Sequence, residues 1–282
     1  MRKTVLFAAA LSAATAVTAQ TGEITSNRGE NWLSQDGDWG LTIDATPFIG
    51  YAGNLFNGTS GNTVPTWISA STWDPYNWAG GGDGGAFGSV TRAVIGVKKL
   101  KDANTAFRGR VRLGFYSHKE TVLVSEIGAT DPNAMVEDVT KTGGNTIQLG
   151  FGLEKRVGST RVVGVYGADL NLGFAGQKKT FEYGNSLDNT GSRISEEKQG
   201  GAMMVGLNAF VGVEWFVAPK VSLGAEYGWG LMLASKGFNK TSWERVTGDN
   251  GPGEVESGTK VNDFGIDTNN NGVSINMNFY FQ

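Results

Sequence analysis

The last stretch of the chain, GVSINMNFYFQ (272–282), alternates between apolar and polar side chains. Its apolar set is Val273, Ile275, Met277, Phe279 and Phe281. Successive side chains of a β-strand point to opposite faces of a sheet, so a period of two predicts a strand with one apolar and one polar face. We expect this strand to belong to a sheet whose other strands share the pattern.

The same alternation recurs in seven stretches upstream, at about residues 39–51, 87–100, 105–124, 147–154, 161–175, 202–217 and 221–234. Long polar stretches at 52–86, 128–144, 177–200 and 235–271 alternate with short turns at 101–104, 157–160 and 218–220. This rhythm is typical of an all-β, antiparallel, up-and-down transmembrane β-barrel. We therefore predict about eight strands, joined by long extracellular loops and short periplasmic turns.

The N-terminal sequence MRKTVLFAAALSAATAVTAQ has the composition of a secretory signal peptide. Arg2 and Lys3 precede an apolar core, and a small-x-small cleavage site ends at Ala19. We predict three parts: a signal peptide at 1–19, a flexible periplasmic segment at 20–38, and an outer-membrane β-barrel at 39–282.

Composition narrows the class of protein further. Glycine accounts for 43 of 282 residues, about twice its usual share, which fits a sharply bending sheet. No stretch after the signal peptide has the roughly 18 apolar residues of a spanning helix, so a membrane protein of this sequence must be a closed barrel. Removing Arg2 and Lys3 leaves 22 of the 24 basic residues against 27 acidic ones, which argues against a nucleic-acid partner. The chain has no Cys, which excludes disulfides.

Nearly all the charge of the predicted strands lies on their polar faces. A basic side chain at the middle of a bilayer costs roughly 2 to 4 kcal/mol, so these residues are expected to point into the lumen. The set comprises Arg92, Lys98, Arg108, Arg110, Arg112, Asp44, Glu154, Asp169, Glu214 and Glu226. Side chains can fill the interior of a barrel of about eight strands, and buried charges there must be paired. We predict a salt-bridge network that plugs the lumen.

The architecture, the charged polar faces and the aromatic C-terminal strand resemble the small eight-stranded outer-membrane barrels of Gram-negative bacteria. That family includes the OmpA transmembrane domain, OmpX and OmpW. The resemblance implies location in the outer membrane, with its lipid and lipopolysaccharide as surroundings. It also implies recognition of Phe279, Tyr280 and Phe281 by the barrel-assembly machinery, although here Gln282 follows the last aromatic residue.

Aromatic residues of the first long polar stretch form one candidate ligand site. Trp67, Trp73, Tyr76 and Trp78 could stack on a sugar or another extracellular ligand. The alternative, which we favour, is that they pack the loop on the mouth of the barrel or join the outer aromatic girdle.

Two other motifs are weaker. Asp267, Asn269 and Asn271 begin a D-x-N-x-N-G calcium loop, but Asn278 occupies the twelfth position, where such a loop has Glu. An Asn-rich turn is the simpler interpretation, and we expect no metal or cofactor. The sole histidine, His118, lies near Ser117 and Glu120, which makes a rim hydrolase or acyltransferase conceivable, but we favour the interpretation that it is a solvated polar residue at the strand exit.

These observations predict a non-enzymatic integral outer-membrane barrel with a plugged lumen. Its role would be structural, or would lie in interaction or adhesion through its loops. The alternative is a narrow porin-like channel or carrier for small or hydrophobic solutes, and a membrane enzyme using His118 is a third, weaker hypothesis.

Overall fold

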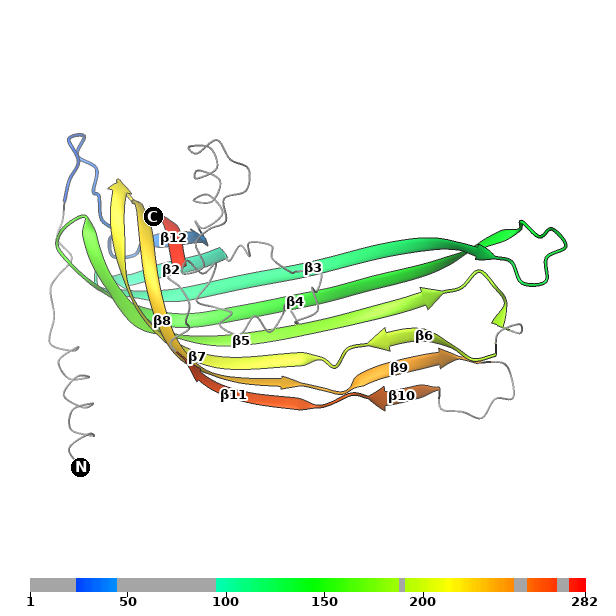
Figure 1. Ribbon diagram of the computed structural model, residues 1–282. Coiled ribbons are helices and arrows are strands. Elements are labelled where there is room, and N and C mark those ends of the chain that lie inside the picture. Colours follow the sequence, from blue (N-terminus) through cyan, green and yellow to red (C-terminus); the bar gives the residue numbers. More distant parts are fainter. Residues whose placement is uncertain (1–23, 45–94, 188–190, 246–252, 268–273) are drawn as a thin grey trace, which may run out of the picture.

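The computed structural model describes residues 24–44, 95–187, 191–245, 253–267 and 274–282. Over these residues the chain is all-β, with twelve strands in one antiparallel sheet, which confirms the predicted fold class at this level (Figure 1). Nowhere in the described ranges is there a helix long and apolar enough to cross a membrane.

The strands are β1 (Trp39–Asp44), β2 (Ile95–Asp102), β3 (Thr105–Ser125), β4 (Met135–Val157), β5 (Val162–Glu182), β6 (Arg193–Lys198), β7 (Ala202–Ala218), β8 (Val221–Lys236), β9 (Asn239–Glu244), β10 (Glu254–Ser257), β11 (Val261–Asp267) and β12 (Ser274–Phe281).

The twelve strands are segments of eight passes of the chain. β6 and β7 follow one another along the same edge of β5, and β9 continues β8 beside them. In the last pass, β10 pairs with β9 while β11 and β12 pair with β8. The prediction of about eight strands was therefore wrong as a strand count, because three of the passes are interrupted.

Glycine accounts for one pair of interruptions. Gly200 and Gly201 separate β6 from β7, and Gly237 lies between β8 and β9. A Cβ on Gly200 would overlap the carbonyl oxygen of Gly237, so the two backbones meet where a larger residue would not fit.

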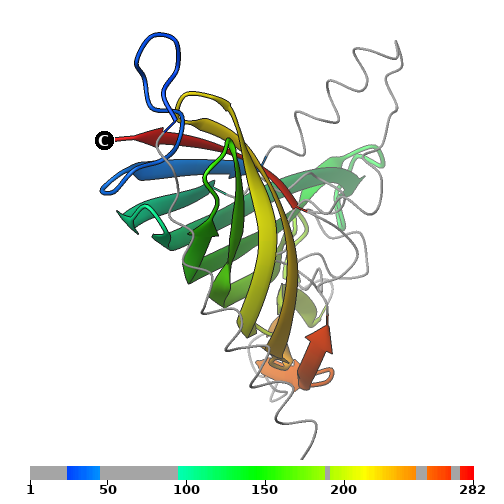
Figure 2. The same cartoon turned by 90° about the vertical axis from the view of Figure 1, so that its left-hand side faces the viewer.

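Eight of the strands pair in a closed circuit, in the order β1, β2, β3, β4, β5, β7, β8, β12 and back to β1. Figure 2 shows the strands following one another around a curved wall. Followed from Asn278 of β12 through β1, β2, β3, β4, β5 and β7, the registers arrive at Met232 of β8. Asn278 itself pairs with Ser222, so the circuit closes with a stagger of ten residues, from 222 to 232.

Alternate residues of the circuit fall into a buried interior face and an exposed outer face. In β7, for example, Met204, Asn208 and Glu214 are buried, whereas Leu207 and Val211 are exposed. Large exposed apolar residues occur on the outer face of all eight strands, and we call this set the apolar belt. It comprises Trp39, Ile95, Val97, Phe107, Leu113, Phe115, Phe151, Leu153, Val162, Leu170, Phe174, Met203, Leu207, Val211, Val213, Trp215, Tyr227, Trp229, Leu233 and Phe281.

Part of the sheet continues well beyond the circuit, and we call this part the extension. It consists of residues 117–125 of β3, 135–143 of β4 and 177–182 of β5, together with β6, β9 and β10. Figure 1 shows these strands running past the ends of β7 and β8.

The extension corrects the predicted long loops. Much of 128–144, 177–200 and 235–271 is strand. Its residues are exposed or half-buried on both faces, so no apolar alternation marks them in the sequence.

The chain before β1 packs against the end of the circuit that carries the short turns, here called the turn end. Leu33 is only 2% exposed and joins a small apolar cluster with Leu100, Phe216 and Tyr280. The backbone N–H of Lys220 donates to the carbonyl of Trp32 at 3.1 Å. Residues 24–38 of the expected flexible lead-in, 20–38, thus contact the turn end of the circuit.

Candidate functional site

Nine charged side chains meet on the interior face, and we call them the interior network. Each is at most 8% exposed. The members are Lys98, Arg108, Arg110, Arg112 and Arg156 with Glu154, Asp169, Glu214 and Glu226. Five basic groups thus face four carboxylates among the described residues.

Glu226 is the acceptor on one wall of the circuit. Its Oε2 receives hydrogen bonds from Nη2 of Arg108 and Nη2 of Arg110, both at 2.8 Å. Arg108 lies on β3 and Glu226 on β8, and three strands separate β3 from β8 in either direction around the circuit. This ion pair therefore connects opposite walls across the interior.

Glu154 gathers three basic groups, one each from β2, β3 and its own strand β4. Its Oε2 lies 2.9 Å from Nζ of Lys98 and 3.4 Å from Nη1 of Arg108, and its Oε1 lies 2.7 Å from Nη1 of Arg156. Glu154 is fully buried, so these contacts replace the hydration that its charge loses on folding.

Glu214 anchors a second cluster, near the turn end. Its Oε2 lies 2.7 Å from Nη1 of Arg156, and its Oε1 accepts hydrogen bonds from the Tyr280 hydroxyl at 2.6 Å and from Asn278 at 3.1 Å. The Ser222 hydroxyl also donates to Glu214. Nη1 of Arg156 donates to the Tyr280 hydroxyl at 3.1 Å, which links β4 to β12 on the opposite wall.

Asp169 is held less closely than the other carboxylates. Its oxygens lie 3.7 Å from Nε of Arg108 and 3.9 Å from Nη1 of Arg110. Gly152 lies opposite Asp169 in the register of β4 and β5, and a Cβ there would overlap Oδ1 of Asp169. The missing side chain of Gly152 makes room for the carboxylate.

Not all of the residues that were predicted to point into the lumen make ion pairs in the structure. Seven of them, Lys98, Arg108, Arg110, Glu154, Asp169, Glu214 and Glu226, make ion pairs with one another. Arg112 instead donates to Oε1 of Gln148 at 3.3 Å. Asp44 ends β1, where its side chain is not described, and Arg92 lies outside the described residues.

Sequence reasoning missed Arg156, Asn278 and Ser222 as network residues. Arg156 has the same parity as Glu154 in β4. Extending the alternation of that strand to its turn would have included it. Asn278 and Ser222 carry no charge, and only the closed register brings them next to Glu214.

The three residues expected to form the assembly signal lie on different faces. Phe281 is 54% exposed and lies opposite Trp39, while Tyr280 is buried and stacks on Phe216 at 5.9 Å. Phe279 is half-buried and lies opposite Leu41.

The structure adds little to the evidence for the remaining candidate sites. Trp67, Trp73, Tyr76, Trp78, Asn269 and Asn271 lie outside the described residues, and Asp267 ends β11 with no described side chain. His118 is exposed and follows Ser117 within one strand, so their side chains point to opposite faces. Among the residues that the structure describes, no group of three or more His, Asp or Glu residues could hold a metal ion.

Comparison with known proteins gives no relative. No family model matches the chain, and no curated protein or solved structure shows significant similarity to it.

Proposed function

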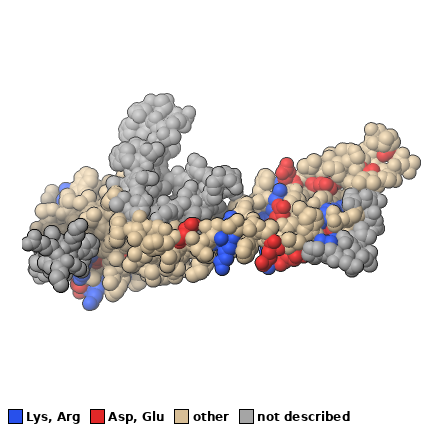
Figure 3. Space-filling model, turned by 60° about the horizontal axis from the view of Figure 1, so that its bottom comes forward, with Lys and Arg blue, Asp and Glu red and all other residues tan. Residues whose placement is uncertain are grey.

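We propose that the chain is an integral outer-membrane β-barrel whose lumen is plugged by the interior network. The observation that carries the proposal is the apolar belt. Large apolar side chains are exposed on every strand of the circuit, whereas the nine charged side chains of the interior network are turned inward. Figure 3 shows a stretch of surface nearly free of charge between two regions where charged side chains gather. In water so large an apolar surface would be unfavourable, and in lipid it is what a barrel requires.

The register supports closure into a barrel. Eight strands with a stagger of ten residues, at the usual rise and spacing of strands, give a tilt of about 40°. Small barrels have tilts of this size. The belt on β3 runs from Phe107 to Phe115, and nine residues suit a tilted strand that crosses the hydrocarbon.

A plugged lumen favours a structural or interaction role. The bridges between Arg108 and Glu226 and between Arg156 and Tyr280 cross the interior from wall to wall. They would obstruct the narrow porin-like channel or carrier, which is therefore the less favoured alternative.

The extension supports the interaction role. Ser125, at the end of β3, lies ten residues beyond Phe115, or about 30 Å along the strand. The tip of the β3–β4 hairpin exposes Val122, Leu123 and Met135. We propose that this end projects outward from the cell and presents a contact surface, and that the turn end faces the periplasm.

Reconstitution into bilayers tests the proposal. In vesicles of brominated lipid, fluorescence of the belt residues Trp215 and Trp229 should be quenched; each is isolated by replacing the other tryptophans with Phe. In planar bilayers the protein should show no large, stable conductance. Absence of quenching would refute the membrane barrel, whereas quenching together with a steady open pore would refute only the plugged lumen.

A further inference from the structure

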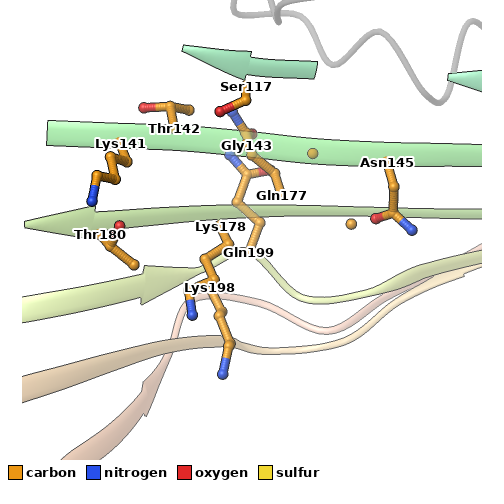
Figure 4. A pocket seen from close by; sticks show the side chains of 12 residues that line it. Ser117, Lys141, Thr142, Gly143, Asn145, Gln177, Lys178, Thr180, Lys198 and Gln199 are labelled. Carbon is orange, nitrogen blue, oxygen red and sulfur yellow. The ribbon is translucent and has the colours of Figure 1, made fainter. Parts of the chain in front are cut away.

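An open hollow of about 530 Å³ lies where the apolar belt meets the extension. Most of its lining residues have the parity of the outer face, and it spans β3, β4, β5 and the end of β6. Gly143 and Gly176 leave space between neighbouring strands, and Lys141, Lys178 and Lys198 surround it. In Figure 4 the side chains of Lys178 and Lys198 extend the same way from adjacent strands, and that of Lys141 extends from β4.

Around this hollow, lysines lie directly opposite lysines. Lys178 of β5 is in register with Lys198 of β6, which is in turn in register with Lys240 of β9. One row farther from the belt, Lys119 of β3 lies opposite Lys141 of β4. Like charges directly across a pair of strands destabilise a sheet. We call these five residues the lysine rows.

Carboxylates offset this repulsion only in part. Glu196 is shared by Lys178 and Lys198, Lys141 pairs with Glu182, and Lys240 pairs with Glu254 and Glu256. Glu196 lies opposite Thr180, one row farther from the belt than Lys178. Pairs between exposed side chains are weak, with a typical value of about 0 to 1 kcal/mol, so a multivalent anion can compete for these lysines.

The belt borders the hollow directly. Phe115 precedes Ser117 by two residues on the same face of β3, and Phe174 precedes Gly176 by two residues on the same face of β5. Phe115 is 69% exposed. A ligand with both an anionic head and an acyl chain could therefore contact the lysine rows and the belt together.

We propose that the lysine rows and the hollow bind the phosphates of an anionic lipid, namely the lipid A part of lipopolysaccharide in the outer leaflet. The inference rests on the proposed membrane barrel, which places the hollow at the level of the lipid headgroups. Ammonium groups form charge-assisted hydrogen bonds with phosphate. The adjoining belt distinguishes a lipid from free phosphate, because only the lipid gains from the apolar contact.

Binding of diphosphoryl lipid A to the full chain in neutral detergent micelles tests the inference, with native mass spectrometry as the readout. We expect the Lys178→Gln/Lys198→Gln variant to bind at least about tenfold more weakly than the unchanged protein. The matched control is Lys101→Gln/Lys155→Gln, which removes two exposed lysines at the turn end and should bind as the unchanged protein does. Dephosphorylated lipid A should bind equally weakly to all three proteins.

If both double variants bind lipid A as tightly as the unchanged protein does, or if both bind it more weakly to the same extent, the lipid site is refuted. Displacement of lipid A by inorganic phosphate at matched concentration would show a free-phosphate site and would also overturn the proposal. Lys119→Gln/Lys141→Gln serves as a second variant should the first fail to fold. The tryptophan quenching described above separates these outcomes from failure of the membrane barrel itself.

Discussion

Arg156 is the residue that most connects the interior network. Its Nη1 lies 2.7 Å from both Glu154 and Glu214, and the residue is fully buried. Arg156→Met leaves two buried carboxylates short of a partner and should lower the free energy of unfolding by about 3 to 5 kcal/mol. Urea unfolding in lipid vesicles, followed by tryptophan fluorescence, measures the loss.

Lys141→Ala is the control, because it breaks an exposed pair with Glu182 and should cost no more than about 1 kcal/mol. Adding Glu214→Gln to Arg156→Met should recover part of the loss, since it removes an unpaired charge. A loss for Arg156→Met as small as that of the control would contradict the view of this residue as the connecting cation.

Gly152 tests the space around Asp169. An added Cβ would overlap Oδ1 of Asp169 and come close to the carbonyl of Ala168. Gly152→Ala should therefore destabilise the protein by about 1 to 3 kcal/mol in the same unfolding measurement. At Gly201 an added Cβ meets no atom within 4 Å, so Gly201→Ala should have little effect. Equal stability of the two variants would mean that the carboxylate moves aside without cost.

At the scale of elements, the sequence was informative wherever a strand has one apolar and one polar face. Residues 105–124 were predicted as a strand and β3 spans Thr105–Ser125, because Phe107, Leu113 and Phe115 mark the outer face. The first half of β4, Met135–Val157, was missed. There the chain is exposed or half-buried on both faces, and Val, Thr, Lys and Glu suit a strand without any apolar period.

Strand β6 has no buried residue, and its Glu196 pairs with Lys178 and Lys198. Hydrogen bonds from Lys178 and Lys198 hold the pKa of Glu196 below its ordinary value. A lowered pKa in the folded state stabilises the strand above the unfolded pKa of about 4.3, and this contribution is lost as the pH falls through the lower, folded value. We expect β6 to loosen at acid pH while the circuit stays intact.

Amide signals of β6 in NMR spectra, recorded between about pH 6 and about pH 3, measure this loosening. The Glu196→Gln variant should already show the loosened strand at the higher pH and change little on acidification. If the unchanged protein and the variant respond to pH in the same way, the carboxylate does not hold β6.

At the scale of the molecule, the closed circuit could be predicted only in outline. Alternation and turn lengths predicted about eight antiparallel strands, whereas the described residues form twelve strands in eight passes. They do not fix the register, and only the register brings Glu226 of β8 against Arg108 of β3. The basic and acidic residues on the polar faces of the strands therefore predicted that these charges must be paired in the lumen. Which residue pairs with which follows from the stagger of the closed circuit, and no local sequence pattern contains it.

The last strand, β12, carries both the proposed assembly signal and side chains that stabilise the interior, and two variants can separate these two contributions. Tyr280 bridges Arg156 and Glu214 in the interior, and Phe281 lies on the outer face opposite Trp39. Deleting residues 280–282 removes the proposed assembly signal and the end of the seam between β12 and β1, so the protein should fail to reach the outer membrane.

Tyr280→Phe keeps the aromatic ring and loses only the hydroxyl. It should insert normally and then unfold at a lower urea concentration, because the Glu214 carboxylate loses one donor. Fractionated cell envelopes measure insertion, and urea titration measures stability. Normal outer-membrane levels of the truncated chain would show that assembly does not depend on this signal, whereas failure of Tyr280→Phe to insert would show that the interior bridge, not the aromatic end, is what assembly requires.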